Sequence, residues 1–251
     1  MNNRDILDKE FSKLNFGSGQ PLAELLNTYK TVAHNYAQLE NALAILSDLQ
    51  ANTSYIYFGG FAKTLGIDKE RTEDEVPSIW EEEILKLIHP DDLASKYLQE
   101  LCFSHFIKRQ PENQRADYYL ASTLRMKNGR NGYTQVLHRI FYVITSPSNT
   151  LRLALCLYNP LSFNIPTKCM IINSVTGQMT GLDKQDGEKI LSIREKQVLS
   201  LIDRGLTSKE IASTLYISIN TVNRHRQEIL GKLRVKNSIE ACRVAKELKL
   251  I

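Results

Sequence analysis

The feature that most constrains this chain is a repeated helix-start signal in its last quarter. A hydrogen-bonding side chain stands three positions before a glutamate in three places, Ser192–Glu195, Thr207–Glu210 and Asn237–Glu240. In this capping-box spacing, the two side chains satisfy free backbone N–H groups at the start of a helix. Ser218 offers a further helix N-cap. The spacing predicts four short helices, at about 193–204, 208–215, 219–234 and 238–249.

Apolar residues recur at helical spacing in all four segments, so the segments can close one small core. Only Tyr216 and Ile217 separate the second helix from Ser218, which forces a sharp helix–turn–helix crossing. The predicted core residues are Val198, Leu199, Ile202, Ile211, Leu215, Ile219, Val222, Ile229, Leu233, Ala241, Val244 and Ala245.

The exposed face of the third helix carries side chains that can read DNA bases. Positions three and four apart are neighbours on a helix, so Asn223, Arg224 and Gln227 share that face. Asn and Gln can pair bidentately with adenine, and Arg with guanine, in the major groove. Five further polar residues are placed where they can grip DNA phosphates. These are Ser218, Thr221, His225, Arg226 and Lys232.

Charge is distributed unevenly along the chain. Residues 188–251 hold 13 Lys and Arg against 7 Asp and Glu, a net charge of +6. The whole chain carries +4, so residues 1–187 carry −2. A basic module on a slightly acidic body indicates a polyanionic partner for that module alone.

The run LSIREKQVLSLIDRGLTSKEIASTLYISINTVNRHRQEILGKL, which begins at residue 191, resembles the LuxR-type (GerE) helix–turn–helix family of bacterial transcription regulators. The resemblance implies four helices, of which the third enters the major groove of double-stranded DNA. It also implies base-reading roles for Asn223, Arg224 and Gln227, dimeric DNA binding and transcriptional control. The matching residues include Leu191, Arg194, Glu195, Val198, Leu199, Gly205, Ile211, Ala212, Leu215, Ile217, Ser218, Thr221, Val222, His225, Ile229, Lys232 and Leu233.

The N-terminal 50 residues predict a polar arm at 1–20 and a long amphipathic helix at 21–50. Apolar residues of the helix follow an a/d heptad pattern over four repeats. Two interpretations stay open, because the seam can pair with a second subunit or lie on its own domain. The predicted dimerisation seam consists of Leu22, Leu25, Tyr29, Val32, Tyr36, Leu39, Leu43 and Leu46.

Residues 51–160 predict a mixed domain of short helices and strands. One strand is expected at 53–58, and three long strands at 116–127, 133–146 and 150–159. The segments NGRNG and SPSN between the long strands are rich in hairpin-forming residues. The fold class is therefore α+β, with an antiparallel sheet domain followed by an all-α four-helix domain at 188–251.

The same region, with LGI at 65–67 and IHPDDL at 88–93, resembles a PAS domain. That resemblance implies a sensor or dimerisation domain, with an N-terminal helix that dimerises. Only one strand, at 53–58, is predicted where PAS domains usually have two. Residues 161–187 are expected to form a linker that holds one more strand and a turn.

A polar cluster of His89, Asp91 and Asp92 has two interpretations, a metal or acid–base site or a helix start. We favour the second, in which Asp91 or Asp92 caps the helix after Pro90. His105 is likewise expected to be packed or on the surface rather than to hold haem. We therefore predict no enzyme activity, no catalytic residue, no metal and no cofactor. A small-molecule ligand of the PAS-like domain is left open.

These patterns together predict a transcription regulator that binds DNA as a homodimer, with RNA polymerase as a further candidate partner. The alternative is a sigma-like RNA polymerase subunit, whose promoter-reading region also resembles the tail. Such a subunit would need a second basic, aromatic helical region for strand opening. The chain has no apolar stretch of about 20 residues, no secretory signal and no CxxC pair, so we predict a cytoplasmic protein without a membrane partner.

Overall fold

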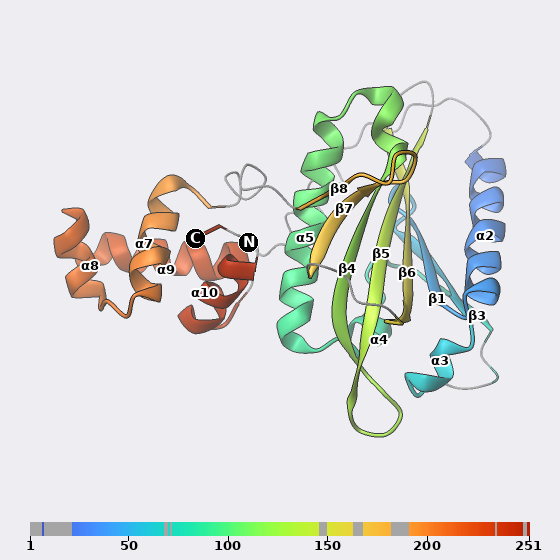
Figure 1. Ribbon diagram of the computed structural model, residues 1–251, viewed down its shortest axis with the longest axis horizontal. Coiled ribbons are helices and arrows are strands. Elements are labelled where there is room, and N and C mark those ends of the chain that lie inside the picture. Colours follow the sequence, from blue (N-terminus) through green and yellow to red (C-terminus); the bar gives the residue numbers. More distant parts are fainter. Residues whose placement is uncertain are drawn as a thin grey trace. The chain divides into compact units, whose positions relative to one another are not determined.

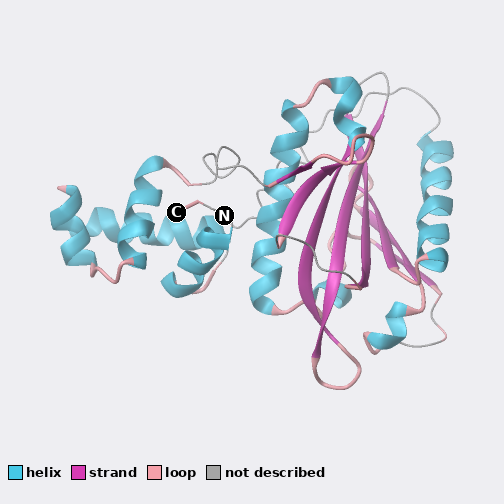
Figure 2. Cartoon of the chain, in the orientation of Figure 1, coloured by secondary structure: helices cyan, strands magenta, loops and turns pink. Residues whose placement is uncertain are grey.

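The computed structural model describes residues 7, 22–67, 70, 72–145, 150–162, 168–181, 191–233, 235–247 and 250–251. It confirms the α+β class, with one antiparallel sheet and a separate run of C-terminal helices (Figures 1 and 2). The chain packs as two compact units. The sheet unit consists of Glu10–Leu93 and Ile107–Gly181. The second unit contains the C-terminal helices and Ala94–Phe106.

Eight antiparallel strands form the sheet, in the order β3-β2-β1-β6-β5-β4-β7-β8. β1 lies between β2, its neighbour in the sequence, and β6, which is far along the chain. The strands are β1 Leu43–Asp48, β2 Thr53–Phe58, β3 Glu73–Val76, β4 Tyr118–Lys127, β5 Tyr133–Thr145, β6 Thr150–Pro160, β7 Cys169–Asn173 and β8 Met179–Thr180.

Helix α2 (Leu22–Leu39) packs on one face of this sheet (Figure 1). Its Ala33 and Ala37 are fully buried among strand residues such as Leu46 and Leu153. Three seam residues, Leu25, Tyr29 and Val32, are partly buried against the same cluster. Of the two interpretations of the heptad pattern, the structure therefore shows the helix on its own domain. Tyr36 and Leu39 remain exposed at its end.

The predicted extent of this helix, to residue 50, is wrong. The helix ends at Leu39, Asn41 takes a left-handed φ of 51°, and the next residues form β1. Leu43 and Leu46, predicted on the dimerisation seam, are fully buried in that strand. The first four residues of β1, Leu43–Leu46, are all apolar and buried, so they also satisfy a heptad pattern.

The prediction of a single strand before the long ones is also corrected. β1 and β2 pair as an antiparallel hairpin, and β3 pairs with the outer side of β2. The NGRNG hairpin is confirmed, since β4 pairs with β5 up to Lys127 and Tyr133. Within the turn, the Asn128 side chain accepts from the backbone N–H groups of Arg130 and Gly132.

One further strand and turn after residue 160 are confirmed by β7 and β8. Several predictions fall outside the described residues: the arm at 1–20 except Leu7, the segment SPSN at 146–149, and the linker from residue 182 to residue 187. The side chain of Leu22 is also outside them.

Helical elements connect the strands, and α5 is the longest helix among the described residues. The elements are α3 Phe61–Thr64, α4 Glu82–Leu85, α5 Pro90–Arg109 and the 3-10 helix η1 Glu112–Asp117.

The predicted cap of α5 is wrong. The cap is His89, whose Nδ1 accepts from the Asp91 backbone N–H at 3.2 Å. Asp92 instead binds Arg125 of β4 through two side-chain contacts of 2.8 Å. Burial alone would raise the pKa of Asp92, but the hydrogen bonds and charge of Arg125 outweigh it and lower that pKa. The cluster is therefore a structural clamp between the start of α5 and the sheet.

The C-terminal helices match the four predicted segments closely. They are α7 Ile193–Asp203, α8 Ser208–Leu215, α9 Ile219–Leu233 and α10 Ser238–Glu247. Among the described residues, no helix is both long and apolar enough to cross a bilayer.

Candidate nucleic-acid interface

The C-terminal helices close one core, as their spacing predicts. Val198, Ile211, Val222 and Leu233 are fully buried, one or more from each of the first three helices, and α10 adds Val244. Of the predicted core residues, Ile202 and Leu215 are half-buried, and Ile219 is 45% exposed. It is the first residue of α9, and the core contacts of that helix begin one turn later at Val222.

The predicted helix caps are confirmed in atomic detail. Ser192 with Glu195 and Thr207 with Glu210 form complete capping boxes at the starts of α7 and α8. At α10, Asn237 accepts from the Glu240 backbone N–H at 2.9 Å. The Glu240 carboxylate turns instead to the backbone N–H of Lys236.

The turn before α9 is held by contacts at both of its ends. Ser218 Oγ accepts from the Thr221 backbone N–H at 3.0 Å and caps α9. Arg194 of α7 donates from Nη2 to the Leu215 carbonyl, which ends α8, at 2.7 Å. Tyr216 takes a left-handed φ of 54° between them. The start of α9 is therefore fixed by side chains from outside the helix as well as by its own cap.

The predicted base-reading residues share one exposed face of α9. Asn223, Arg224 and Gln227 are all exposed, and the Arg224 side chain is 70% exposed. Ser218 is exposed and Thr221 is half-buried at the N-terminus of the helix. Unpaired backbone N–H groups and the helix dipole make such a terminus attractive to phosphate.

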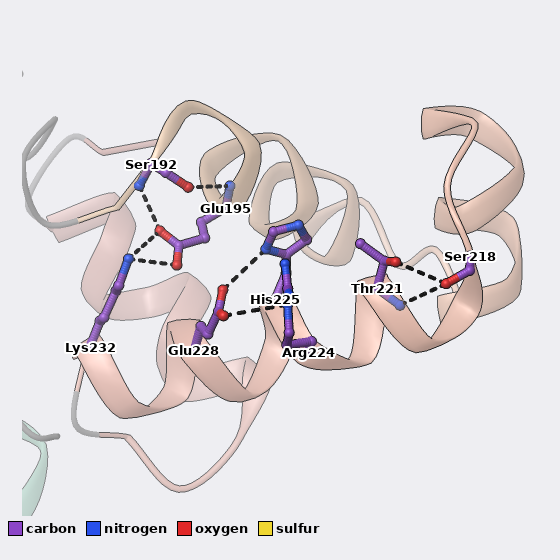
Figure 3. A network of polar contacts seen from close by, with 8 residues as sticks. All are labelled: Ser192, Glu195, Ser218, Thr221, Arg224, His225, Glu228 and Lys232. Atoms are coloured by element: carbon purple, nitrogen blue, oxygen red, sulfur yellow. Dashed lines mark hydrogen bonds and ion pairs between the residues drawn. The ribbon is translucent and has the colours of Figure 1, made fainter.

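Three residues predicted to contact phosphates have partners within the domain (Figure 3 shows two of them). Arg226 donates to Ser208 Oγ at 3.3 Å and to Ser238 Oγ at 3.0 Å, and so connects α9 with α8 and α10. His225 contacts Glu228, and Lys232 contacts Glu195. These contacts give each side chain a structural role in the folded domain, whatever its role toward DNA.

Glu195 is a buried carboxylate that the sequence marked only as a capping residue. Its side chain is 1% exposed and accepts from the Ser192 backbone N–H at 2.6 Å (Figure 3). Lys232 Nζ lies 2.6 Å from Oε1 and 2.7 Å from Oε2. Burial would raise the pKa of Glu195, but hydrogen bonds from Lys232 and Ser192, with the lysine charge, lower it. Two residues far apart in the sequence thus form one ion pair.

Glu228 is a further residue of α9 that the sequence analysis missed. Its Oε1 lies 3.5 Å from Arg224 Nε, and its Oε2 lies 3.3 Å from His225 Nδ1 (Figure 3). The spacing of four residues between Arg224 and Glu228 was a usable signal, because oppositely charged groups at i and i+4 meet on a helix.

A group of potential metal ligands lies in this unit, formed by Glu195, His225 and Glu228. One ligand atom of each lies within 4.8 Å of the others. Glu195 already has the ammonium of Lys232 as its cation, so a metal would have to displace an ion pair. The prediction of no metal therefore stays a prediction.

Comparison with known proteins assigns the helical segment to a family. Residues 189–245 match the family described as "Bacterial regulatory proteins, luxR family". The oxygen regulatory protein NreC of Staphylococcus aureus (strain JH9) is 42% identical over 66 residues, which are 26% of this chain and 30% of NreC. The chain thus matches less than a third of that relative's length.

Two solved structures are similar over most of both chains. A phage VqmA–DPO complex is 16% identical and covers 92% of this chain and 94% of its own, with a TM-score of 0.34. Escherichia coli SdiA is 17% identical and covers 99% and 97%, with a TM-score of 0.24. The TM-scores are low, and the family assignment rests on residues 189–245.

Proposed function

We propose that this chain, whose residues 189–245 are a LuxR-family helix–turn–helix domain, is a sequence-specific DNA-binding regulator of transcription. The observation that carries the proposal is the exposed face of α9. There, Asn223, Arg224 and Gln227 project together from a helix whose start is fixed by a cap and by the turn before it. Side chains of these types hydrogen-bond to base edges in the major groove.

The electrostatics support the same docking. The net charge of +6 on residues 188–251 favours association with a polyanion. With α9 in the groove, Ser218 and Thr221 at its N-terminus are placed toward one phosphate backbone. His225, Arg226 and Lys232 are predicted as further phosphate contacts. The contacts of Arg226 and Lys232 inside the domain also join α9 to the neighbouring helices.

We propose that the chain binds its site as a homodimer. A single domain of this size reads few base pairs, whereas two domains about one helical turn apart gain affinity and select a near-palindromic site. Part of the seam predicted over residues 21–50 cannot contact a second subunit, because Leu43 and Leu46 are buried in β1. Tyr36 and Leu39 are the exposed apolar residues that remain of it.

We propose that the sheet unit is a PAS-like domain that senses a signal or mediates dimerisation. Its support is the antiparallel sheet covered by α2, with polar groups buried inside it. Ser54 Oγ donates to Glu81 Oε1 at 2.5 Å, and Ser122 Oγ lies 3.2 Å from His138 Nδ1. A metabolite that stabilises the protein against heat would favour sensing over a purely structural role.

The sigma-like alternative is not favoured by the comparisons, since the matched family consists of bacterial regulatory proteins. That family also supports the prediction that the chain is not an enzyme. RNA polymerase as a partner of the DNA-bound regulator remains a prediction.

The decisive experiment is selection of binding sites from randomised duplex DNA by the full chain at two salt concentrations. We expect enrichment of a near-palindromic sequence that persists at the higher salt concentration. Salt-sensitive binding with no enriched sequence would overturn the proposal, since that behaviour belongs to a basic module without base readout.

A further inference from the structure

Glu228 is the only acidic residue among the 15 residues of α9. It lies on the exposed face, one residue after Gln227 and four after Arg224, and its side chain is 42% exposed. A carboxylate on a surface that approaches phosphates is repelled by them, so a helix that only needed affinity for DNA would lack one.

Both carboxylate oxygens of Glu228 contact a side chain of the same helix in the free protein. Oε1 lies 3.5 Å from Arg224 Nε, and Oε2 lies 3.3 Å from His225 Nδ1 (Figure 3). The ion pair places a carboxylate beside the Arg224 guanidinium and offsets its charge.

The other two cationic side chains of α9 are already engaged elsewhere. Arg226 donates to the hydroxyls of Ser208 and Ser238, and Lys232 to the buried carboxylate of Glu195. Arg224 is therefore the cation of the exposed face that can contact DNA. Its ion pair with Glu228 competes with that contact. This relationship makes Glu228 a control on binding rather than a neutral surface residue.

We propose that Glu228 is a specificity-determining residue of the DNA-binding face, an inference that rests on the proposed function. On the correct site, Arg224 leaves the ion pair to contact guanine, and the freed carboxylate accepts a hydrogen bond from a cytosine N4 amino group nearby. Guanine and thymine present acceptors at the corresponding edge of the major groove, and these repel a carboxylate. On incorrect DNA, the pair stays closed, and the Glu228 carboxylate offsets the Arg224 charge that would otherwise attract phosphate.

The test is site selection from randomised duplex DNA by the full chain in four forms. These are the wild type, Glu228→Gln, Glu228→Asp and the control Asp203→Asn. Asp203, at the end of α7, forms an ion pair with Lys246 of α10 at 2.7 Å, and its substitution changes the net charge by the same amount as Glu228→Gln. Thermal unfolding of each variant shows that the comparison is made between folded proteins.

We expect the wild type to select cytosine at one position of each half-site. Glu228→Gln should lose that preference by about tenfold, with adenine gaining, because Gln pairs with adenine. Its affinity for a duplex of unrelated sequence should rise several-fold, because the substitution removes one negative charge from the surface that faces the phosphates. Glu228→Asp should keep the low affinity for unrelated DNA but weaken the cytosine preference, since its side chain is shorter. Asp203→Asn should select the wild-type site.

The outcomes separate the two proposals. If the wild type enriches no sequence, the proposed function fails. If the wild type enriches a site and Glu228→Gln enriches the same site with the same base frequencies and the same affinity for unrelated DNA, only the role of Glu228 is overturned. Loss of all binding by Glu228→Gln at an unchanged melting temperature would overturn it too, because the carboxylate would then supply affinity rather than discrimination.

Discussion

Lys232 contacts both carboxylate oxygens of Glu195, and the contact ties the last turn of α9 to the first turn of α7. The Glu195 side chain is 1% exposed, whereas that of Lys232 is 37% exposed. The carboxylate is therefore shielded from water, and Lys232 and the Ser192 backbone N–H contact it in place of water. A residue that the sequence assigns to DNA contact thus also stabilises the domain that presents the recognition helix.

Replacing Lys232 by Met should destabilise the C-terminal domain by about 1–3 kcal/mol. Breaking a buried pair costs more than this, but solvent reaches the lysine and reduces the loss. Urea unfolding measures the change, with Lys246→Met as the matched control, because Lys246 pairs with Asp203 in a more exposed setting. The control should lose less than about 1 kcal/mol. Equal losses in the two variants would contradict the role given to Glu195.

Stability of the same domain should fall in acid through Glu195. Its pKa in the folded protein lies below the ordinary value of 4.5. A lowered folded pKa means that the contribution to stability is complete above 4.5 and is lost as the pH falls through the folded value. Urea unfolding between about pH 3 and about pH 7 should show a shallower acid loss for Glu195→Gln than for the wild type. Parallel curves for the two proteins would count against this assignment.

Replacing Arg224 by Ala should weaken binding to the selected site by about 1–3 kcal/mol and relax the preference at one base pair. The reason is that, in the proposed docking, Arg224 is a bidentate donor to guanine that alanine cannot replace. Competition binding with single-base variants of the site measures both effects. Arg204→Ala, at the exposed end of α7, removes the same charge away from the face and should leave the base preferences unchanged. An unchanged preference in Arg224→Ala would show that α9 docks in another orientation.

Replacing Gly205 by Ala should destabilise the helical domain by about 1 kcal/mol through backbone strain alone. Gly205 follows α7 with a φ of +85°, and a Cβ added at this position would meet no atom within 4 Å. Gly181→Ala is the control, because that glycine also has open space but no left-handed φ. Thermal unfolding compares the two, and a neutral Gly205→Ala would mean that the turn relaxes without cost.

The helical domain was predictable because its determinants are local. Ser192, Thr207 and Ser218 cap helices through residues three positions away, and the core repeats within each helix. The ion pair of Lys232 with Glu195 was not predictable, because it depends on how α9 packs against α7. The same is true of Asp92, which reads as a helix cap in sequence but binds Arg125 across the fold.

The sheet domain was predicted least well where its residues are most buried. Leu43 and Leu46 belong to an unbroken apolar run, residues 42–46, that shows no period of two, so the run fits a helix or a strand equally. The pairing of β1 with β6 decides between these, and it depends on residues far along the chain. Strands with a polar face or an Asn-Gly turn, such as β4 and β5, were located correctly.

The central place of β1 also sets an order of events during synthesis. Leu43 pairs with Tyr158, so β1 stays half-paired on the ribosome until β6 has emerged. Until then its apolar edge is a surface to which chaperones can bind and from which aggregation can start. The helices α7–α10 make their contacts within a short stretch of chain and should fold in a fraction of the time. The helices that carry the proposed DNA-binding face would then fold soon after they are made, and the sheet would complete its pairing later.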